Sequence, residues 1–187
     1  MHSGIVLGYH GCSRETAEGI LSGKIRHLRC SNSSSEWLGR GVYFWENSYD
    51  RALQWATDTL KAKEPTVVGA IINPGHCLDL ADSEWLKALK KVSKDFEKRY
   101  QEQFGKPVEP NDIARRFHPY DCALINDFCD VWARAGNAPI NTVRAAFPEG
   151  NPIVNSSFRT LNHIQWAVLT PSESIVGYFR PTQKRGI

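Results

Sequence analysis

The chain has 187 residues, of which 41% are hydrophobic, and its formal net charge is +3. This length and apolar content are typical of one globular domain with its own core, and no apolar run approaches the length of a membrane-spanning helix. The charge permits an acidic or nucleic-acid partner but is too small to indicate one.

The chain is predicted to begin with a strand and a short helix. The strand is Ile5–Tyr9, an apolar run that ends in a tyrosine. Ser13 can cap the following helix, and Gly23 can end it. The polar and basic residues 24–36 come next. They are either a flexible loop or a segment that covers a ligand.

Residues 38–56 predict a strand, a turn and a helix, and we expect the rest of the chain to be organised around them. Val42–Trp45 is a β-branched and aromatic run that follows Gly39 and Gly41. Two glycines beside an aromatic strand let the backbone approach a flat ligand, with Tyr43 as one wall of the slot. The alternative is a buried strand with an ordinary aromatic core. The helix then carries apolar residues at helical spacing, at Ala52, Trp55, Ala56 and Leu60.

The middle of the chain predicts another strand and then a helical block. Thr66–Ile72 is the strand, and residues 76–80 can continue it after a turn. Ser83–Phe104 has the pattern of one long amphipathic helix, with lysines and glutamates on its outer face. A second helical region is expected at about residues 111–135.

Three further strands are predicted after this block, at Asn141–Phe147, Ile164–Leu169 and Ile175–Phe179. Short strands around a central helical block indicate an α+β protein, and we expect two small sheets around a cleft. Residues 1–187 would form a single domain, with the helical block of about residues 81–135 inserted into it.

Three short motifs that follow one another along the chain resemble the NAD-binding core of the ADP-ribosyltransferases. The first is His10-Gly11 at the end of a strand, and the second is the Gly-x-Gly-x-Tyr-Phe run from Gly39 to Phe44. The third is Asn162–Val168, in which Gln165 stands where the poly(ADP-ribose) polymerase-like enzymes carry glutamate. The resemblance is to the polymerase-like and diphtheria-toxin-like branch. It implies an ADP-ribosyltransferase-like fold, with two small antiparallel or mixed sheets around an NAD cleft.

The resemblance also implies how NAD would be held. His10 would donate a hydrogen bond to a ribose hydroxyl, and Gly11 would offer its backbone N–H and C=O to the nicotinamide carboxamide. A side chain at position 11 would obstruct that contact. Gly41 would let the backbone come close to the ligand, and Tyr43 would stack on the nicotinamide ring.

The helix after the second motif matches the family less closely. A second stacking aromatic normally comes from this helix. A match without gaps places Gln54 there, with Trp55 one position further on. The same match places Arg51 where the polymerases carry a small hydroxyl residue. Arg51 and Trp55 are therefore included among the expected NAD-binding residues.

Gln165 is the main departure from the family pattern. A glutamine oxygen can accept a hydrogen bond from the nicotinamide ribose, but it lacks the charge that stabilises the growing cation. Elongation of a polymer is therefore not expected. Glu149, in a loop flanked by glycine and proline, is a candidate to supply the missing charge, although it can equally be a solvated acid in a turn. Glu36 and Glu46, near the second motif, rank after it.

The motifs favour an NAD-dependent mono-ADP-ribosyltransferase that releases nicotinamide and modifies a protein or nucleic acid. The expected biological role is that of a bacterial toxin or a defence effector that acts inside a cell, for which an antitoxin or inhibitor would be a further partner. One alternative is a non-catalytic module that binds NAD or ADP-ribose. Another is a nucleic-acid-binding domain that uses the basic residues 24–29 and the lysine-rich helix face.

The cysteines and the N-terminus bear on compartment and metals. The five cysteines are scattered without a CxxC pair, so the sequence predicts neither a disulfide framework nor a zinc site. The N-terminus has no basic segment followed by a long apolar one, and no signal peptide is expected. A reducing cytoplasm is the simplest expectation. The histidines outside the motifs show no pattern that indicates a metal.

Overall fold

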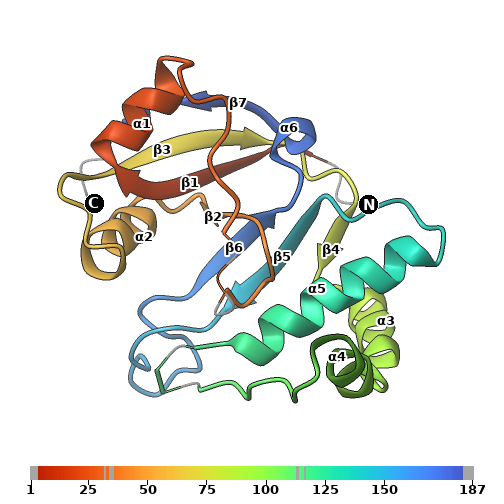
Figure 1. Ribbon diagram of the computed structural model, residues 1–187. Coiled ribbons are helices and arrows are strands. Elements are labelled where there is room, and N and C mark those ends of the chain that lie inside the picture. Colours follow the sequence, from red (N-terminus) through yellow and green to blue (C-terminus); the bar gives the residue numbers. More distant parts are fainter. Residues whose placement is uncertain (1–3, 32, 34–35, 113, 116, 183–187) are drawn as a thin grey trace.

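The fold is α+β and is built on one mixed sheet, as the computed structural model shows for residues 4–31, 33, 36–112, 114–115 and 117–182 (Figure 1). Within these residues, the strands follow the order β4-β5-β6-β2-β1-β3-β7. β4 and β5 pair in parallel, and the other neighbours pair antiparallel. The strands are β1 (Val6–Ser13), β2 (Val42–Glu46), β3 (Pro65–Ile72), β4 (Cys77–Asp79), β5 (Thr142–Phe147), β6 (His163–Val168) and β7 (Ile175–Phe179).

The prediction of an α+β class is confirmed, but the prediction of two separate sheets is wrong. β1 and β2 join the two halves of the sheet through two residue pairs, Gly8 with Glu46 and Tyr9 with Trp45. By contrast, β1 pairs with β3 along its whole length. The sheet is therefore continuous at one end of β1 and divided at the other, where His10 and the residues after it lie.

Helices cover the two halves of the sheet separately. Figure 1 shows α1 and α2 beside β1 and β3, and α3, α4 and α5 beside the half that contains β4 and β5. On that second half, Ile125 and Phe128 of α5 belong to one buried cluster with Leu78 and Val143. The helices are α1 (Arg14–Leu21), α2 (Tyr49–Gln54), the π-helical η1 (Trp55–Thr59), α3 (Ser83–Ser93), α4 (Phe96–Phe104), α5 (Pro119–Arg134) and α6 (Pro171–Ser174).

The predicted single helix over residues 83–104 is in fact two helices, α3 and α4. The break allows Phe96, the first residue of α4, to be completely buried. Arg99 stabilises the break, because its guanidinium donates to the carbonyl of Val92 at 2.8 Å and also pairs with Asp127 of α5. An apolar stripe alone does not reveal such a bend, since its spacing continues through the break.

Two other boundaries differ from the prediction. α5 begins at Pro119 and not near residue 111, because a proline favours the first turn of a helix and lacks the N–H that an interior position needs. Residues 76–80 do not extend β3. Cys77–Asp79 within this stretch form β4, the edge strand farthest from β7, where Cys77 pairs with Thr142. The Thr142 hydroxyl donates to the carbonyl of Pro74 at 2.8 Å and so holds the turn that redirects the chain.

Among the described residues, no helix combines the length and the apolar character that crossing a bilayer requires.

Candidate functional site

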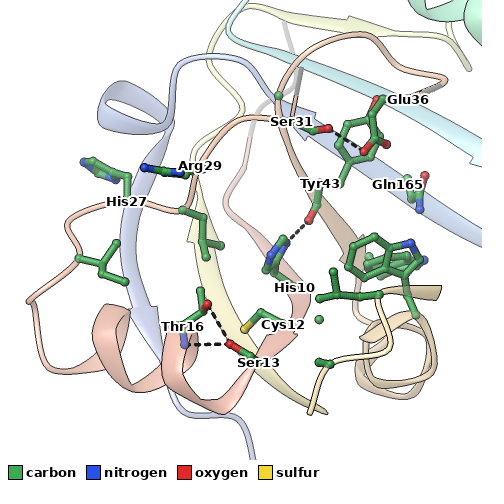
Figure 2. A pocket seen from close by; sticks show the side chains of 18 of the residues that line it. His10, Cys12, Ser13, Thr16, His27, Arg29, Ser31, Glu36, Tyr43 and Gln165 are labelled. Atoms are coloured by element: carbon green, nitrogen blue, oxygen red, sulfur yellow. Dashed lines mark hydrogen bonds between the residues drawn. The ribbon is translucent and has the colours of Figure 1, made fainter. Parts of the chain in front are cut away.

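The candidate site lies where β1 and β2 separate. A pocket of about 900 Å³ opens there, and we call it the main pocket (Figure 2). A second pocket of about 290 Å³, the side pocket, adjoins it. Six of the predicted site residues line the main pocket, namely His10, Gly11, Gly41, Tyr43, Trp55 and Gln165. The other two, Arg51 and Glu149, line the side pocket, which shares Glu36, Trp45, Trp55 and Gln165 with the main pocket.

Gly11 presents its backbone to the opening between β1 and β2. The carbonyl of Leu7 accepts from the N–H of Asn47, so Leu7 directs its backbone groups toward β2. Peptide groups alternate in direction along a strand, and the β1–β3 register runs without a shift. Gly11, four residues on, therefore directs its N–H and C=O to the same side, where the pairing with β2 has ended. One donor and one acceptor on the same side of the strand can pair with the C=O and the NH₂ of a primary amide.

The reason for a glycine at position 11 differs from the expectation. A Cβ atom on Gly11 would lie 2.0 Å from the carbonyl oxygen of Ala52 in α2. The glycine is therefore required by the close approach of α2 to β1. We expected a side chain there to obstruct the ligand, but it would first collide with the helix.

His10 bridges the opening through its side chain. Its Nδ1 lies 2.8 Å from the backbone carbonyl of Tyr43. A carbonyl can only accept, so Nδ1 carries the proton, and burial lowers the pKa of the imidazole. A neutral His10 with this tautomer leaves Nε2 as an acceptor. A ribose hydroxyl would thus donate to His10, which reverses the direction of the predicted hydrogen bond.

Tyr43 is 9% exposed and is anchored through its phenol group. The hydroxyl donates to the carbonyl of Gly39 at 2.7 Å and accepts from the N–H of Leu38 at 2.9 Å. Burial raises the pKa of Tyr43 well above its usual value, and the charge of Glu36 adds to this effect. The phenol therefore stays protonated and holds the segment before β2, while the residue lines the main pocket.

This anchor leads to a stability prediction. Tyr43→Phe keeps the ring but removes both hydrogen bonds, and it leaves the buried N–H of Leu38 without this partner. We expect a loss of about 1–3 kcal/mol in the free energy of unfolding, measured by urea denaturation. A loss below about 0.3 kcal/mol would contradict the assigned role of the hydroxyl. Tyr178→Phe, which removes a hydroxyl that accepts from Leu28 outside β2, is the matched control.

Trp55 rather than Gln54 lines the main pocket. Trp55 is the first residue of the π-helical segment that continues α2, and π-helical turns are often found at functional sites. Its ring centroid lies 5.9 Å from that of Trp45, which lines both pockets. The aromatic side chain from this helix is therefore Trp55, one position after Gln54, the residue that the match without gaps assigns to the stacking role. Sequence reasoning gave no role to Trp45.

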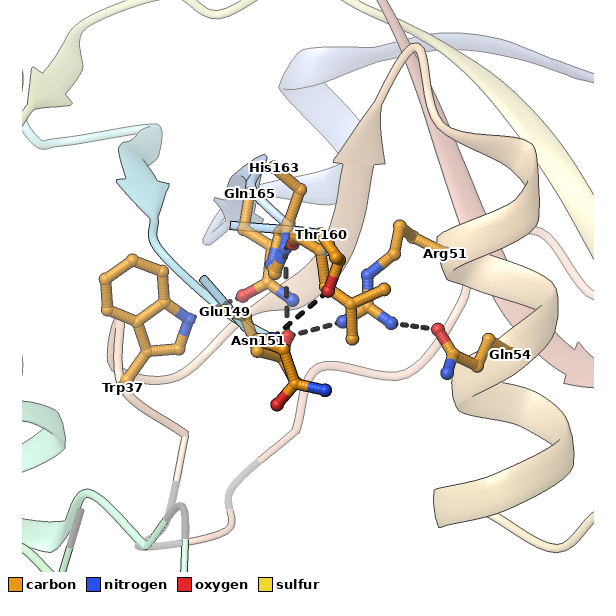
Figure 3. Close-up of polar contacts among 9 residues, drawn as sticks. Trp37, Arg51, Gln54, Glu149, Asn151, Thr160, His163 and Gln165 are labelled. Atoms are coloured by element: carbon orange, nitrogen blue, oxygen red, sulfur yellow. Dashed lines mark hydrogen bonds and ion pairs between the residues drawn. The ribbon is translucent and has the colours of Figure 1, made fainter. Parts of the chain in front are cut away.

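Gln165 lies on β6 at the boundary between the two pockets (Figures 2 and 3). Its side-chain oxygen accepts a hydrogen bond from Nε1 of Trp37. An indole nitrogen can only donate, so this contact determines which way the amide is turned. The amide NH₂ is left as a donor. We expected the oxygen to be available to a ribose, but Trp37 already occupies one of its acceptor positions.

Arg51 and Glu149 form an ion pair in the side pocket (Figure 3). Their side chains are 15% and 11% exposed, so the pair is largely removed from solvent. His163 lies close by, with Nδ1 at 3.8 Å from the Glu149 carboxylate and 2.7 Å from the carbonyl of Leu161. Burial lowers the pKa of His163. Because Arg51 offsets the charge of Glu149, Glu149 is a weaker source of free negative charge than the sequence suggested.

Glu36 lines both pockets. Its carboxylate accepts a hydrogen bond from the Ser31 hydroxyl at 2.8 Å. Burial raises the pKa of Glu36, and this hydrogen bond lowers it in part. Glu46, the other acid near the second motif, instead accepts from Nε1 of Trp166 at 2.7 Å and lies 3.3 Å from Arg144. Residues 32, 34 and 35 of the predicted covering loop lie outside the described residues.

The far end of the main pocket is basic. Lys24, His27 and Arg29 line it, together with the hydroxyl-bearing Ser13 at the end of β1 and Thr16 of the first turn of α1. The Nδ1 atom of His27 is buried and has no hydrogen-bond partner among the described residues. The sequence predicts residues 24–36 to be a flexible loop or a segment that covers a ligand, with residues 24–29 as an alternative nucleic-acid surface. Its position adds a cationic end to a pocket whose other end has aromatic walls.

Comparison of the chain with protein-family models, with curated protein sequences and with solved structures returned no match. Within the part of the chain that the structure describes, no group of three or more histidine, cysteine and acidic side chains is placed to hold a metal.

Proposed function

We propose that the chain is an NAD-dependent mono-ADP-ribosyltransferase with an ADP-ribosyltransferase-like fold. The main pocket would bind NAD, and the acceptor would be a protein or a nucleic acid. The observation that carries the proposal is the position of Gly11. Its N–H and C=O face a pocket with aromatic walls at the end of a strand pairing, as a nicotinamide carboxamide would require.

The rest of the main pocket supports a dinucleotide. Its volume of about 900 Å³ lies near the upper end of the range of about 300–1,000 Å³ that is usual for small-molecule sites. Tyr43 and Trp55 offer faces to a planar ring, and Nε2 of His10 offers an acceptor to a ribose hydroxyl. Lys24 and Arg29 provide positive charge for a diphosphate at the other end.

The proposed reaction breaks the bond between the nicotinamide nitrogen and C1 of the ribose. The bonding electron pair leaves with nicotinamide, and positive charge develops on the ribose. A nucleophilic atom of the acceptor then bonds to C1 and loses its proton to water. Holding NAD in one conformation is the main contribution of the pocket. The amide of Gln165 cannot act as a base toward a ribose hydroxyl, so the proposal is single transfer and not polymer growth.

The direct test is nicotinamide release from NAD, measured together with NAD affinity by calorimetry. Radiolabelled NAD with separate protein, RNA and DNA fractions then identifies the acceptor class. The alternative is a non-catalytic module that binds NAD or ADP-ribose, and the amide at position 165 favours it. Binding without nicotinamide release in the presence of all three fractions would support that alternative.

Affinity for NAD should depend on His10. His10→Ala removes the acceptor for a ribose hydroxyl and also the bridge to the carbonyl of Tyr43. We expect NAD binding to weaken by about 1–3 kcal/mol, which is about 5- to 150-fold, in a calorimetric titration of the folded variant. His76→Ala is the control, because His76 also lies 2.9 Å from a backbone carbonyl but outside both pockets. Equal NAD affinity in the two variants would remove His10 from the site.

A further inference from the structure

The proposed reaction requires negative charge beside the ribose, and position 165 does not supply it. Gln165 carries a neutral amide whose oxygen accepts from Trp37. Electrostatic stabilisation of a developing charge is often the largest contribution to catalysis. On the proposed function, another side chain must provide that charge.

Among the described residues, three acidic side chains line the two pockets, and one of them reaches the main pocket. Among the described residues, Glu36 is the acid that lines the main pocket, while Asp58 and Glu149 line the side pocket alone. Glu149 is also paired with Arg51. Glu36 instead accepts a hydrogen bond from the neutral hydroxyl of Ser31. Its charge is not offset by an ion pair with any lysine or arginine of the described chain.

Glu36 is held in place by the residues around it. Ser31, its hydrogen-bond donor, pairs with Gly41 through two backbone hydrogen bonds of 2.7 and 3.3 Å. The carbonyl of Glu36 accepts from the N–H of Gly39 at 3.0 Å. Trp37, the next residue, donates to Gln165. The segment that carries the carboxylate is thus held by the second motif on one side and, through Trp37, by β6 on the other.

Figure 2 shows Glu36 and Gln165 on the side of the main pocket where Tyr43 lies. After burial, the negative charge of Glu36 is the second cause of the raised pKa of the Tyr43 phenol. In the proposed complex, the nicotinamide would stack on Tyr43, and the reacting ribose carbon is bonded directly to that ring. A carboxylate close to Tyr43 is therefore close to the carbon on which positive charge develops.

We propose that Glu36 supplies the carboxylate charge that stabilises the ribose cation, and that Gln165 acts as a positioning residue that holds Trp37 and, through it, Glu36. The catalytic charge then comes from the segment before β2 and not from β6. Glu36 forms no covalent bond in this step. The nicotinamide still leaves with the electron pair of the broken bond, and the acceptor still provides the nucleophile.

The test compares nicotinamide release and NAD affinity in Glu36→Gln, Gln165→Glu and the double variant. Glu36→Gln should lower kcat about 100-fold, as is usual when one electrostatic stabiliser is removed, while NAD affinity changes less than about 3-fold. The double variant moves the carboxylate to position 165. It should recover at least about 10-fold in kcat over Glu36→Gln, because the new glutamate can still accept from Trp37. Glu36→Asp, which keeps the charge on a shorter side chain, should be intermediate.

Glu173→Gln is the matched control. Glu173 accepts one hydrogen bond, from Asn141 at 3.0 Å, and lies outside both pockets, so its kcat should stay within about 2-fold of the wild type. If Glu36→Gln kept a kcat within about 3-fold of the wild type, the role assigned to Glu36 would be overturned and the proposed function would stand. A large loss confined to Glu149→Gln would overturn it in favour of the side-pocket acid. A wild-type chain that binds NAD and releases no nicotinamide with any acceptor would instead overturn the proposed function, and the inference with it.

Discussion

Arg51→Met is expected to lower the free energy of unfolding by about 3–5 kcal/mol, because it breaks a largely buried ion pair by removing one of its two charges. Glu149 is 11% exposed at its side chain, and Arg51 offsets its charge. Water cannot replace the guanidinium well at such a site. Urea denaturation followed by tryptophan fluorescence measures the loss. Nicotinamide release should survive in the fraction that stays folded, since the pair lines the side pocket only.

Two controls separate burial from charge. Arg40→Met breaks the ion pair with Asp130, whose partners are 53% and 49% exposed, and should cost less than about 1 kcal/mol. The double variant Arg51→Met/Glu149→Leu removes both charges and should recover at least half of the loss, because an apolar pair fits a desolvated site. If Arg51→Met cost no more than Arg40→Met, the side pocket would be well hydrated, and Glu149 would again be a candidate source of charge.

The strands around the site could be predicted because their signals are local. Val42–Trp45 was expected as a strand, and β2 is Val42–Glu46. β-branched and aromatic residues after two glycines specify such an element with little help from the rest of the chain. The same holds for Thr66–Ile72, which lies within β3. The α+β class follows from the order of these elements.

The contacts that define the site could not be predicted, because they join residues far apart in the chain. Trp37 and Gln165 are separated by 128 positions, and Arg51 and Glu149 by 98. No periodicity links such pairs. The orientation of the Gln165 amide follows from the hydrogen bond donated by Trp37, a residue to which the sequence analysis gives no role. As a source of negative charge, Glu36 ranks below Glu149 in the sequence analysis because of the composition of the loop around Glu149. Loop composition gives no information about which acid pairs with an arginine.

Sheet connectivity was missed for a related reason. The sequence predicts two small sheets around a cleft, but two residue pairs between β1 and β2 keep all the described strands in one sheet. Two pairs are too few to leave a pattern in the sequence. The position of β4 beside β5 likewise depends on Thr142 and the turn at Pro74, which are 68 positions apart.

Gly11→Ala is expected to damage both the fold and the NAD site. The added Cβ would lie 2.0 Å from the backbone oxygen of Ala52, so α2 or β1 must move. Overpacking of this kind typically costs about 1–3 kcal/mol, and the contact with backbone places Gly11→Ala near the upper value. For a chain of this size, the melting temperature should fall by about 6–12 °C. Any shift of β1 also displaces the N–H and C=O that face the main pocket, so NAD affinity should fall by more than about 10-fold.

Two other glycines distinguish loss of stability from loss of the site. A Cβ on Gly8 would lie 2.7 Å from Ile72 and 2.8 Å from Phe44, so Gly8→Ala should also destabilise β1. Gly8 belongs to the strand segment that still pairs with β2, and NAD affinity should change less than about 3-fold in the folded protein. Gly177→Ala meets nothing within 4 Å and should leave both quantities unchanged. If Gly8→Ala and Gly11→Ala weakened NAD binding equally, the effect would reflect the strand as a whole, and the carboxamide contact assigned to Gly11 would be wrong.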